Sequence, residues 1–381
     1  MLIRNIGLLF SGDVAMPLLD ADSILIEGGR ITQVGRALEG AGPRIDAQGC
    51  AVVPGLIDNH VHPAFGDWTP RQNQLGWIEA FAHGGVTTMV SAGEVHVPGR
   101  PKDPVGVRAL AIAAQRCFDA FRPLGVKVLA GAPVPERAMT AADYAGMAQD
   151  GIRWLGEIGL GTVRDPEEAA RHARWARAAG LNSMIHCGGP SIAGSNRMGH
   201  EAVCAADADI VAHINGGPTS LSADELTKVM AGTRRANEIV HNGNPRTALH
   251  ALRTLGEMAA LARLVVGTDS PAGSGVQPLG ILRTIAFLAS VGGLDPGVAI
   301  ATATGNIAHW RGLEQGIIAA GRPADLVFMD APLGGAGRDA AQSLALGDLP
   351  GIGGVIIDGV ARIVGRSRNT PPPGRIPEWT T

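Results

Sequence analysis

The chain has 381 residues, of which 45% are hydrophobic and 18% are charged, and its formal net charge is −3. This balance is typical of a well-buried globular protein, and it excludes extensive disorder and the basic surface that nucleic-acid binding requires. No apolar run approaches the roughly 20 residues of a membrane span, and Gly7–Phe10 is too short for a secretory core. The four scattered cysteines contain no Cys-x-x-Cys pair and fit a reducing compartment. We therefore expect a cytoplasmic protein with neither a nucleic-acid nor a membrane partner.

The first 53 residues contain short apolar runs that are separated by turn residues, which predicts strands. The expected strands span residues 2–6, 23–27, 31–34 and 51–53. Gly28 and Gly29, between the second and third of these, predict a hairpin turn.

From position 54 the pattern changes to apolar strands that alternate with helix-like segments. The eight expected strands are residues 56–60, 85–91, 126–130, 152–158, 183–186, 210–214, 238–241 and 264–268. The expected helices include residues 166–179, preceded by Asp165 as N-cap, and residues 223–236. This alternation favours a (β/α)8 barrel over an open sheet.

Strand-like runs return at residues 324–329, 354–359 and 361–364, and we expect them to pair with the N-terminal strands. The predicted domains are therefore a small β-sandwich built from both chain ends (residues 1–53 and 316–366), a barrel (residues 54–315) and a C-terminal arm (residues 367–381). The prolines at 371–373 predict that the arm continues no strand or helix.

Candidate metal ligands recur at the ends of the expected strands. His60 and His62 lie two residues apart on the first strand, so their side chains share a face. The other candidates, at the ends of the fourth, fifth, sixth and eighth strands, are Glu157, His186, His213 and Asp269. Each alone could be a paired polar core residue, but a barrel brings all these strand ends together. Four imidazoles and two carboxylates exceed the needs of one tetrahedral ion, and they predict two divalent metal ions with a bridging carboxylate.

Two segments resemble the signatures of the amidohydrolase superfamily: residues 54–62, Pro-Gly-Leu-Ile-Asp-Asn-His-Val-His, and residues 316–327. The resemblance implies that His60, His62 and Asp269 hold one metal and that His186 and His213 hold the other. Many members bridge their metals with a carbamylated lysine on the fourth strand, but the three lysines of this chain, Lys102, Lys127 and Lys228, lie elsewhere. Glu157 is therefore expected to bridge.

Longer strings resemble the enamidase group within the superfamily, namely residues 69–72, 83–89, 98–103, 156–162, 213–219, 278–283 and 367–372. This resemblance implies hydrolysis of a carboxylated cyclic amide, such as 6-oxo-1,4,5,6-tetrahydronicotinate, to 2-formylglutarate and ammonia. It also implies that Asp269 is catalytic, acting first as general base and then as general acid, and that the protein is a homo-oligomer, namely a tetramer. The same resemblance implies a mixed iron–zinc centre, whereas ligand chemistry alone makes zinc the default metal.

Arg71, nine residues after His62, is the best-placed cation for a substrate carboxylate, with a solvated or structural loop arginine as the competing interpretation. Arg197 and Arg246 are weaker candidates. Asn215 and Asn242 could hydrogen-bond the substrate or fix loops.

Three alternatives to this function stay open. Another cyclic amide, imide or lactone hydrolase could use the same scaffold, and so could a deaminase. More remotely, the fold could serve as a non-catalytic assembly protein, although all six ligand types are present.

Overall fold

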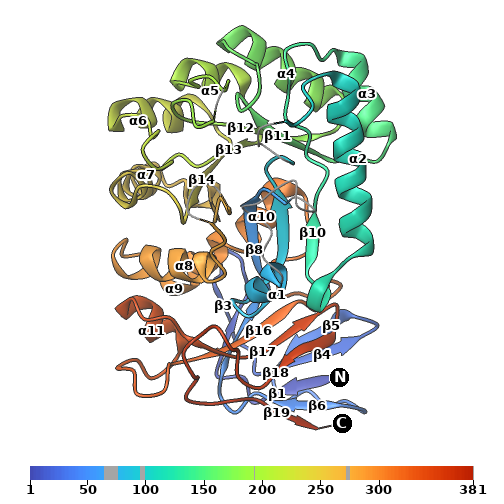
Figure 1. Ribbon diagram of the computed structural model, residues 1–381. Coiled ribbons are helices and arrows are strands. Elements are labelled where there is room, and N and C mark those ends of the chain that lie inside the picture. The colour runs from blue at the N-terminus through green and yellow to red at the C-terminus, as the bar shows by residue number, and fades with distance from the viewer. Residues whose placement is uncertain (64–75, 95–98, 193, 272–274, 381) are drawn as a thin grey trace.

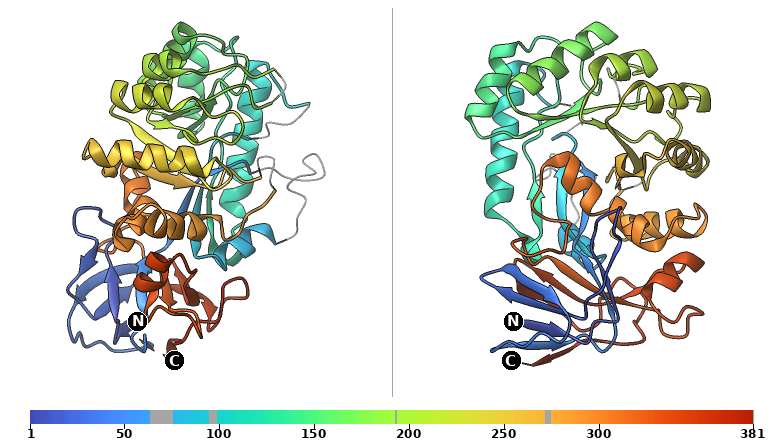
Figure 2. Two further views of the ribbon diagram at one scale, coloured as in Figure 1. Left: turned by 90° about the vertical axis from the view of Figure 1, so that its left-hand side faces the viewer. Right: turned by 180° about the vertical axis from the view of Figure 1, so that it is seen from behind.

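The computed structural model describes residues 1–63, 76–94, 99–192, 194–271 and 275–380. Figure 1 shows both ends of the chain in the lower part of the molecule, with the middle of the chain above them. The two termini lie near each other at one end of the molecule in every view (Figures 1 and 2). Among the described residues, no helix is both long and apolar enough to cross a membrane.

Eight parallel strands occupy the segments in which the sequence predicts them, but they form two sheets. One sheet has the order β10-β9-β8, and the other has the order β11-β12-β13-β14-β15. The strands are β8 (Leu56–Val61), β9 (Val86–Ser91), β10 (Lys127–Leu129), β11 (Trp154–Ile158), β12 (Asn182–Ile185), β13 (Ile210–Val211), β14 (Ala236–Val240) and β15 (Leu264–Gly267).

The helices of this part of the chain are α1 (Trp77–Ala82), α2 (Pro104–Ala120), α3 (Ala141–Gln149), α4 (Pro166–Ala178), α5 (His200–Ala206), α6 (Ala223–Gly232), α7 (Pro245–Glu257), α8 (Gly280–Ser290), α9 (Pro296–Thr302) and α10 (Gly305–Arg311), with 3-10 turns at Pro123–Gly125 and Leu261–Arg263. Helices α1 to α8 alternate with these strands, whereas α9 and α10 follow α8 directly, and Ile307 of α10 packs in one cluster with Val90 and Ile210 of the strands (Figure 1).

Asp165 caps α4 as predicted, accepting from the backbone N–H of Glu168 at 2.9 Å. The predicted helix 223–236 is too long, because α6 ends at Gly232 and β14 begins at Ala236.

The strand pairing does not continue as a regular ladder at the two junctions between the sheets, so the predicted closed barrel is not found as a single sheet. Backbone hydrogen bonds still cross both junctions. Between β15 and β8, the Asp269 N–H donates to the His60 carbonyl at 2.9 Å. Between the first sheet and β11, the Glu157 N–H donates to the Ala92 carbonyl at 2.9 Å and the Gly156 N–H donates to the Pro133 carbonyl at 3.0 Å.

Gly156 permits this second junction. A Cβ at this position would lie 3.0 Å from the carbonyl oxygens of Ala92 and Ala132, closer than real Cβ contacts normally allow. The absence of a side chain therefore lets β11 approach the ends of β9 and β10, and this approach positions the next residue, Glu157.

The two chain ends build two further sheets. Their orders are β19-β6-β1-β4-β5 and β18-β17-β16-β7-β2-β3. The strands are β1 (Leu2–Arg4), β2 (Leu8–Phe10), β3 (Leu18–Leu19), β4 (Ser23–Glu27), β5 (Arg30–Gly35), β6 (Arg44–Asp46), β7 (Ala51–Pro54), β16 (Leu326–Asp330), β17 (Gly351–Ile357), β18 (Val360–Val364) and β19 (Glu378–Thr380), and α11 (Ala340–Leu346) lies between β16 and β17.

The predicted pairing of the two chain ends is confirmed by β7 and β16, which run antiparallel with Val52 opposite Phe328. One hydrophobic cluster joins the sheets, with Ile3 and Ile24 from the first and Val52 and Phe328 from the second. The predicted hairpin is also present, since β4 and β5 pair across Gly28 and Gly29, whose φ angles of 55° and 80° suit glycine.

The C-terminal tail, predicted as an arm in which the prolines at 371–373 continue no strand or helix, ends in a short strand. Its last described residues form β19, which pairs antiparallel with β6. This strand begins after Pro377 and lies at a sheet edge, where the preceding prolines disrupt no ladder. Ser367 also fixes the start of the tail, because its hydroxyl donates to the His83 carbonyl at 2.6 Å.

Candidate metal centre

The six predicted metal ligands lie together at the carboxyl ends of the parallel strands. His60 is on β8 and His62 directly follows it, while Glu157 is on β11. The others follow β12, β13 and β15, and they are His186, His213 and Asp269. All are nearly fully buried except Asp269, whose side chain is 17% exposed.

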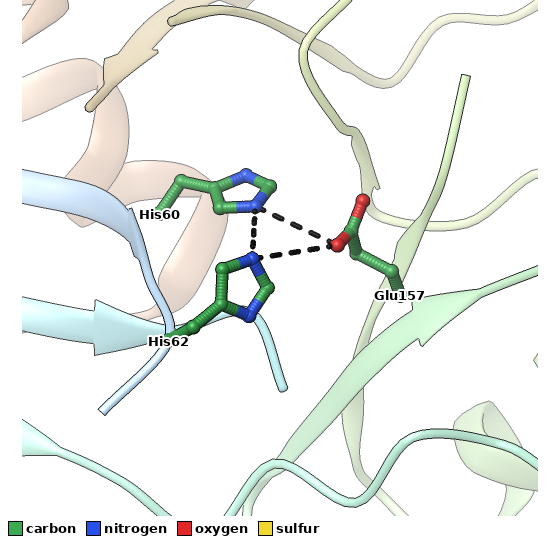
Figure 3. A group of neighbouring side chains, drawn as sticks. All are labelled: His60, His62 and Glu157. Carbon is green, nitrogen blue, oxygen red and sulfur yellow. Dashed lines mark hydrogen bonds and ion pairs between the residues drawn. The ribbon is translucent and has the colours of Figure 1, made fainter. Parts of the chain in front are cut away.

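Glu157 lies between two groups of histidines. Its Oε2 is 3.6 Å from His60 Nε2 and 3.7 Å from His62 Nε2, and Figure 3 shows both imidazoles directed at this carboxylate. Its Oε1 is 2.7 Å from His213 Nε2 and 3.5 Å from His186 Nδ1. Each carboxylate oxygen therefore faces a different pair of imidazoles, which is the arrangement that a bridging ligand requires.

Asp269 completes the group around His60 and His62. Its Oδ1 lies 3.4 Å from His60 Nε2 and 3.3 Å from His62 Nε2. Its backbone φ is 58°, and that of His213 is 26°, so both residues occupy conformations that non-glycine residues seldom adopt. Such strain costs of order 1–3 kcal/mol per residue and concentrates at functional sites.

Three of the four histidines use their remaining ring nitrogen to contact an oxygen. His60 Nδ1 lies 2.6 Å from Glu238 Oε2, and His62 Nδ1 lies 2.9 Å from the Gly93 carbonyl. His186 Nε2 lies 2.8 Å from the Gly189 carbonyl. An oxygen acceptor at one nitrogen fixes the proton there and leaves the lone pair of the other nitrogen directed at the site, as in metal-ligating histidines.

The buried imidazoles and carboxylates of the cluster shift one another's pKa values. Burial raises the pKa of Asp269, but His60 and His62 outweigh it and bring that pKa to about 2. Burial likewise raises the pKa of Glu157, yet His213 and His60 hold it well below its usual value. Burial lowers the pKa of His60, but Glu238 and Asp269 raise it well above its ordinary value.

The residues fit two divalent metal ions. Three overlapping sets of possible ligands have all their donor atoms within 4.8 Å of one another. The sets are His60, His62 and Glu157; His60, His213 and Asp269; and Glu157, His186 and His213. Imidazole and carboxylate donors suit zinc and iron, and bound cations would supply the positive charge that the buried carboxylates demand.

A cavity of about 490 Å³ opens onto the cluster. It reaches His62, Glu157, His186, His213 and Asp269. Its other described lining residues are Leu160, Ser191, Ile192, Gly216, Gly217, Pro218, Thr219 and Asn242. None of these described residues is an arginine or a lysine.

The predicted substrate-binding residues differ in their positions relative to the cavity. Arg71 lies outside the described residues. Asn242 lines the cavity, and its Nδ2 donates to the Asp269 carbonyl at 3.2 Å. Asn215 instead contacts the Val240 backbone with both amide atoms, at 3.0 and 2.8 Å, which favours the loop-fixing interpretation. Arg197 is half-exposed and pairs with Glu225 at 2.5 Å.

Cys187, beside His186, has no features of a nucleophile. It is fully buried, and this burial raises its pKa to about 12, so the reactive thiolate is strongly disfavoured.

Sequence reasoning missed Glu238, which contacts His60. A carboxylate at the first position of the expected seventh strand, directly before the apolar pair Ile239 and Val240, was the available signal. A charged residue within a buried strand requires a partner, and here that partner is a candidate metal ligand.

Comparison with known proteins places the chain in a family. A sequence model of the amidohydrolase family matches residues 51–362, so the chain belongs to this family. It is 46% identical over 378 residues to the enamidase of Eubacterium barkeri, covering 98% of each protein. A crystal structure of enamidase matches with a TM-score of 0.95 and 45% identity over the whole of both chains.

More distant relatives share the fold and part of the sequence. The adenine deaminase of Ruegeria sp. (strain TM1040) is 27% identical over 336 residues, which are 82% of this chain and 51% of the deaminase. A beta-aspartyl dipeptidase structure from Fervidobacterium islandicum AW-1 matches with a TM-score of 0.65 at 17% identity, which shows a common fold alone. The predicted family and its mixed α/β fold are thus confirmed.

Proposed function

We propose that this protein hydrolyses the ring C–N bond of a cyclic amide, in particular an enamide lactam such as 6-oxo-1,4,5,6-tetrahydronicotinate. The observation that carries the proposal is Glu157, which directs one oxygen at each of two histidine pairs beside a cavity. The 46% identity to an enamidase over nearly the whole chain supports this substrate class.

In this proposal His60, His62 and Asp269 hold one divalent ion, His186 and His213 hold the other, and Glu157 bridges them. The ions would lower the pKa of a water molecule from 15.7 to about 7 and so supply hydroxide at neutral pH. Zinc, or zinc with iron, suits the ligand set. Elemental analysis of purified protein by mass spectrometry would identify the metals.

Asp269 is the proposed proton carrier. With its pKa at about 2 its carboxylate is ionised at neutral pH, and its side chain is the most exposed of the six. It can therefore take the proton of the attacking water and deliver it to the ring nitrogen that leaves. With an enamide, the released enamine tautomerises to an imine, and a second water converts this imine to an aldehyde and ammonia. The lactam and two water molecules thus yield 2-formylglutarate and ammonia.

We propose that Arg71 binds the substrate carboxylate. A guanidinium matches a carboxylate in two parallel hydrogen bonds, and the described residues of the cavity lining include no arginine or lysine. Asn242 lines the same cavity and is a further candidate for substrate contact.

The decisive experiment is to incubate the metal-replete protein with 6-oxo-1,4,5,6-tetrahydronicotinate and to assay ammonia. We expect release of one ammonia per lactam, and none from Asp269→Asn. Hydrolysis of a simple cyclic imide, lactam or lactone without ammonia from the enamide would overturn the substrate. Deamination of a purine instead would favour the adenine deaminase relatives.

We also propose that residues 54–315 form one (β/α)8 barrel and that residues 1–53 and 316–366 form one β-sandwich, followed by the tail. The hydrogen bonds across both sheet junctions and the shared cluster of the two terminal sheets support this division. We further propose a cytoplasmic homo-tetramer, and light scattering of the purified protein would measure its mass.

A further inference from the structure

A buried hydrogen-bond network leads from the end of α10 to His60. The Arg311 Nε–H donates to Asn59 Oδ1 at 2.6 Å, and Asn59 Nδ2 donates to Glu238 Oε1 at 2.5 Å. The other oxygen of Glu238 lies 2.6 Å from His60 Nδ1. All four side chains are at most 2% exposed. We call Arg311, Asn59 and Glu238 the His60 network.

The donor-only guanidinium of Arg311, at one end of the His60 network, determines how the amide of Asn59 is oriented. A guanidinium only donates, so the amide oxygen of Asn59 must face Arg311 and its NH2 group must face Glu238. The 2.6 Å contact between His60 Nδ1 and Glu238 Oε2 is a hydrogen bond when Nδ1 carries the proton and the carboxylate oxygen accepts it. Nε2 is then the ring nitrogen available to a metal ion, and it faces the oxygens of Glu157 and Asp269 at 3.6 and 3.4 Å.

Glu238 has no arginine or lysine among its described contacts, and His60 is the titratable side chain that it touches. A buried carboxylate without compensation is costly. The amide of Asn59 and the backbone N–H of His213, 3.2 Å from Oε2, are its other donors. Arg311 supplies the nearest guanidinium, one side chain away, and Glu238 in turn raises the pKa of Arg311 against the larger lowering effect of burial.

We propose that Arg311 and Asn59 are positioning residues for a metal ligand, acting through Glu238 to hold His60 with Nε2 free for the metal. This inference rests on the proposed metal centre. It extends that centre to three residues that touch neither the cavity nor the proposed metal ions, and it links α10 to the site.

The chain offers a matched control for Asn59. Asn182 also accepts a hydrogen bond from Arg311, from an Nη at 2.8 Å, but its own Nδ2 donates to the Trp310 carbonyl and leads away from the site. Asn59→Ala and Asn182→Ala therefore each remove one hydrogen bond of Arg311, and only Asn59→Ala interrupts the path to His60.

The test compares the metal affinities of the two variants by competition with a chelator, using zinc as the probe, and their stabilities by urea unfolding. We expect Asn59→Ala to weaken one of the two zinc sites by roughly 10- to 100-fold, the range seen for residues that orient metal ligands. Asn182→Ala should stay within about twofold of wild type, because the hydrogen bonds of Asn182 do not lead to a metal ligand. Equal loss in both variants, or none in Asn59→Ala, would overturn the proposal.

Glu238→Gln provides a second test that nearly preserves volume. Its carboxamide has one acceptor oxygen, whereas Glu238 accepts with both oxygens, so one amide N–H must face a donor. We expect a zinc site at least tenfold weaker, and unchanged affinity would contradict the network. A wild-type protein that binds two zinc ions but releases no ammonia would overturn the proposed function alone, whereas one that binds no metal would overturn both.

Discussion

Both carboxylate oxygens of Asp58, on β8, accept hydrogen bonds from Thr268, which directly follows β15. Oδ2 accepts from the Thr268 hydroxyl at 2.6 Å, and Oδ1 accepts from the Thr268 backbone N–H at 2.9 Å. Burial raises the pKa of Asp58 to about 7, although these hydrogen bonds lower it. The pair joins two strands between which no regular ladder runs, and Asp269 is the next residue.

Thr268→Val should therefore both destabilise the fold and disturb the site. The loss of a buried hydrogen bond to a carboxyl group costs about 1–3 kcal/mol. We expect that decrease in the free energy of urea unfolding, together with reduced metal content. Thr284→Val is the matched control, since the Thr284 hydroxyl donates only to the Gly280 carbonyl within α8. Metal loss in the control as well would contradict a specific role of Thr268.

Lys127 should stabilise the contact between the parallel strands and the terminal sheets. Its Nζ lies 2.6 Å from Asp325 and 2.8 Å from Asp358, and the side chain of Asp325 is only 1% exposed. Lys127→Met leaves Asp325 buried without its cation, which we expect to lower the free energy of unfolding by about 3 kcal/mol. Arg36→Met removes an exposed ion pair with Asp20 and should produce no measurable change. Similar effects of both variants would contradict the argument from burial.

Glu157→Gln should keep the fold but lose most of one metal and nearly all activity. A carboxamide presents an oxygen to only one of the two histidine pairs that the carboxylate faces. Elemental analysis and circular dichroism would measure metal content and folding. Glu94→Gln is the control, because Glu94 is a buried carboxylate that accepts from the Gly131 and Ala132 backbone and is no proposed ligand. Full metal occupancy in Glu157→Gln would overturn the bridging role.

Arg71→Ala should raise KM for a carboxylated lactam far more than it changes metal content, since the proposed ligands remain in place. Steady-state kinetics with the lactam and with its uncharged amide analogue would separate the two interpretations of this residue. A loss of equal size on both substrates would indicate that Arg71 only shapes its loop.

His172 should make the protein less stable in mild acid. It is fully buried, its Nδ1 lies 2.6 Å from the Tyr144 hydroxyl, and burial lowers its pKa from 6.5 to about 4. The folded state therefore resists protonation, so stability is complete above pH 6.5 and declines as the pH falls toward 4. At about 1.4 kcal/mol per pKa unit the loss is at most about 3.5 kcal/mol.

His172→Asn keeps an acceptor for Tyr144 but binds no proton in this range. Urea unfolding between pH 7.5 and 4 should show the stability advantage of wild type over the variant shrinking as the pH falls. Parallel curves for the two proteins would contradict the assignment.

The sequence alone predicted the strands and the six candidate ligands because both depend on local patterns. An apolar run ending in His-x-His predicts a strand with two imidazoles on one face, and the same reasoning located Glu157 on its strand. The Asp165 cap and the hairpin at Gly28 and Gly29 are equally local, because neighbouring backbone groups decide them.

Only the tertiary structure decided which distant residues share a hydrogen bond. Glu238 and His60 are 178 positions apart, and no local pattern connects them. Asn215 similarly contacts the backbone of another strand and not the cavity, and the tail ends as a strand because β6 presents a free edge. The division into two parallel sheets arises where Gly156 approaches Ala92 past a short β10. Periodicity reports which face of an element is buried, whereas the packing of whole elements determines what lies opposite that face.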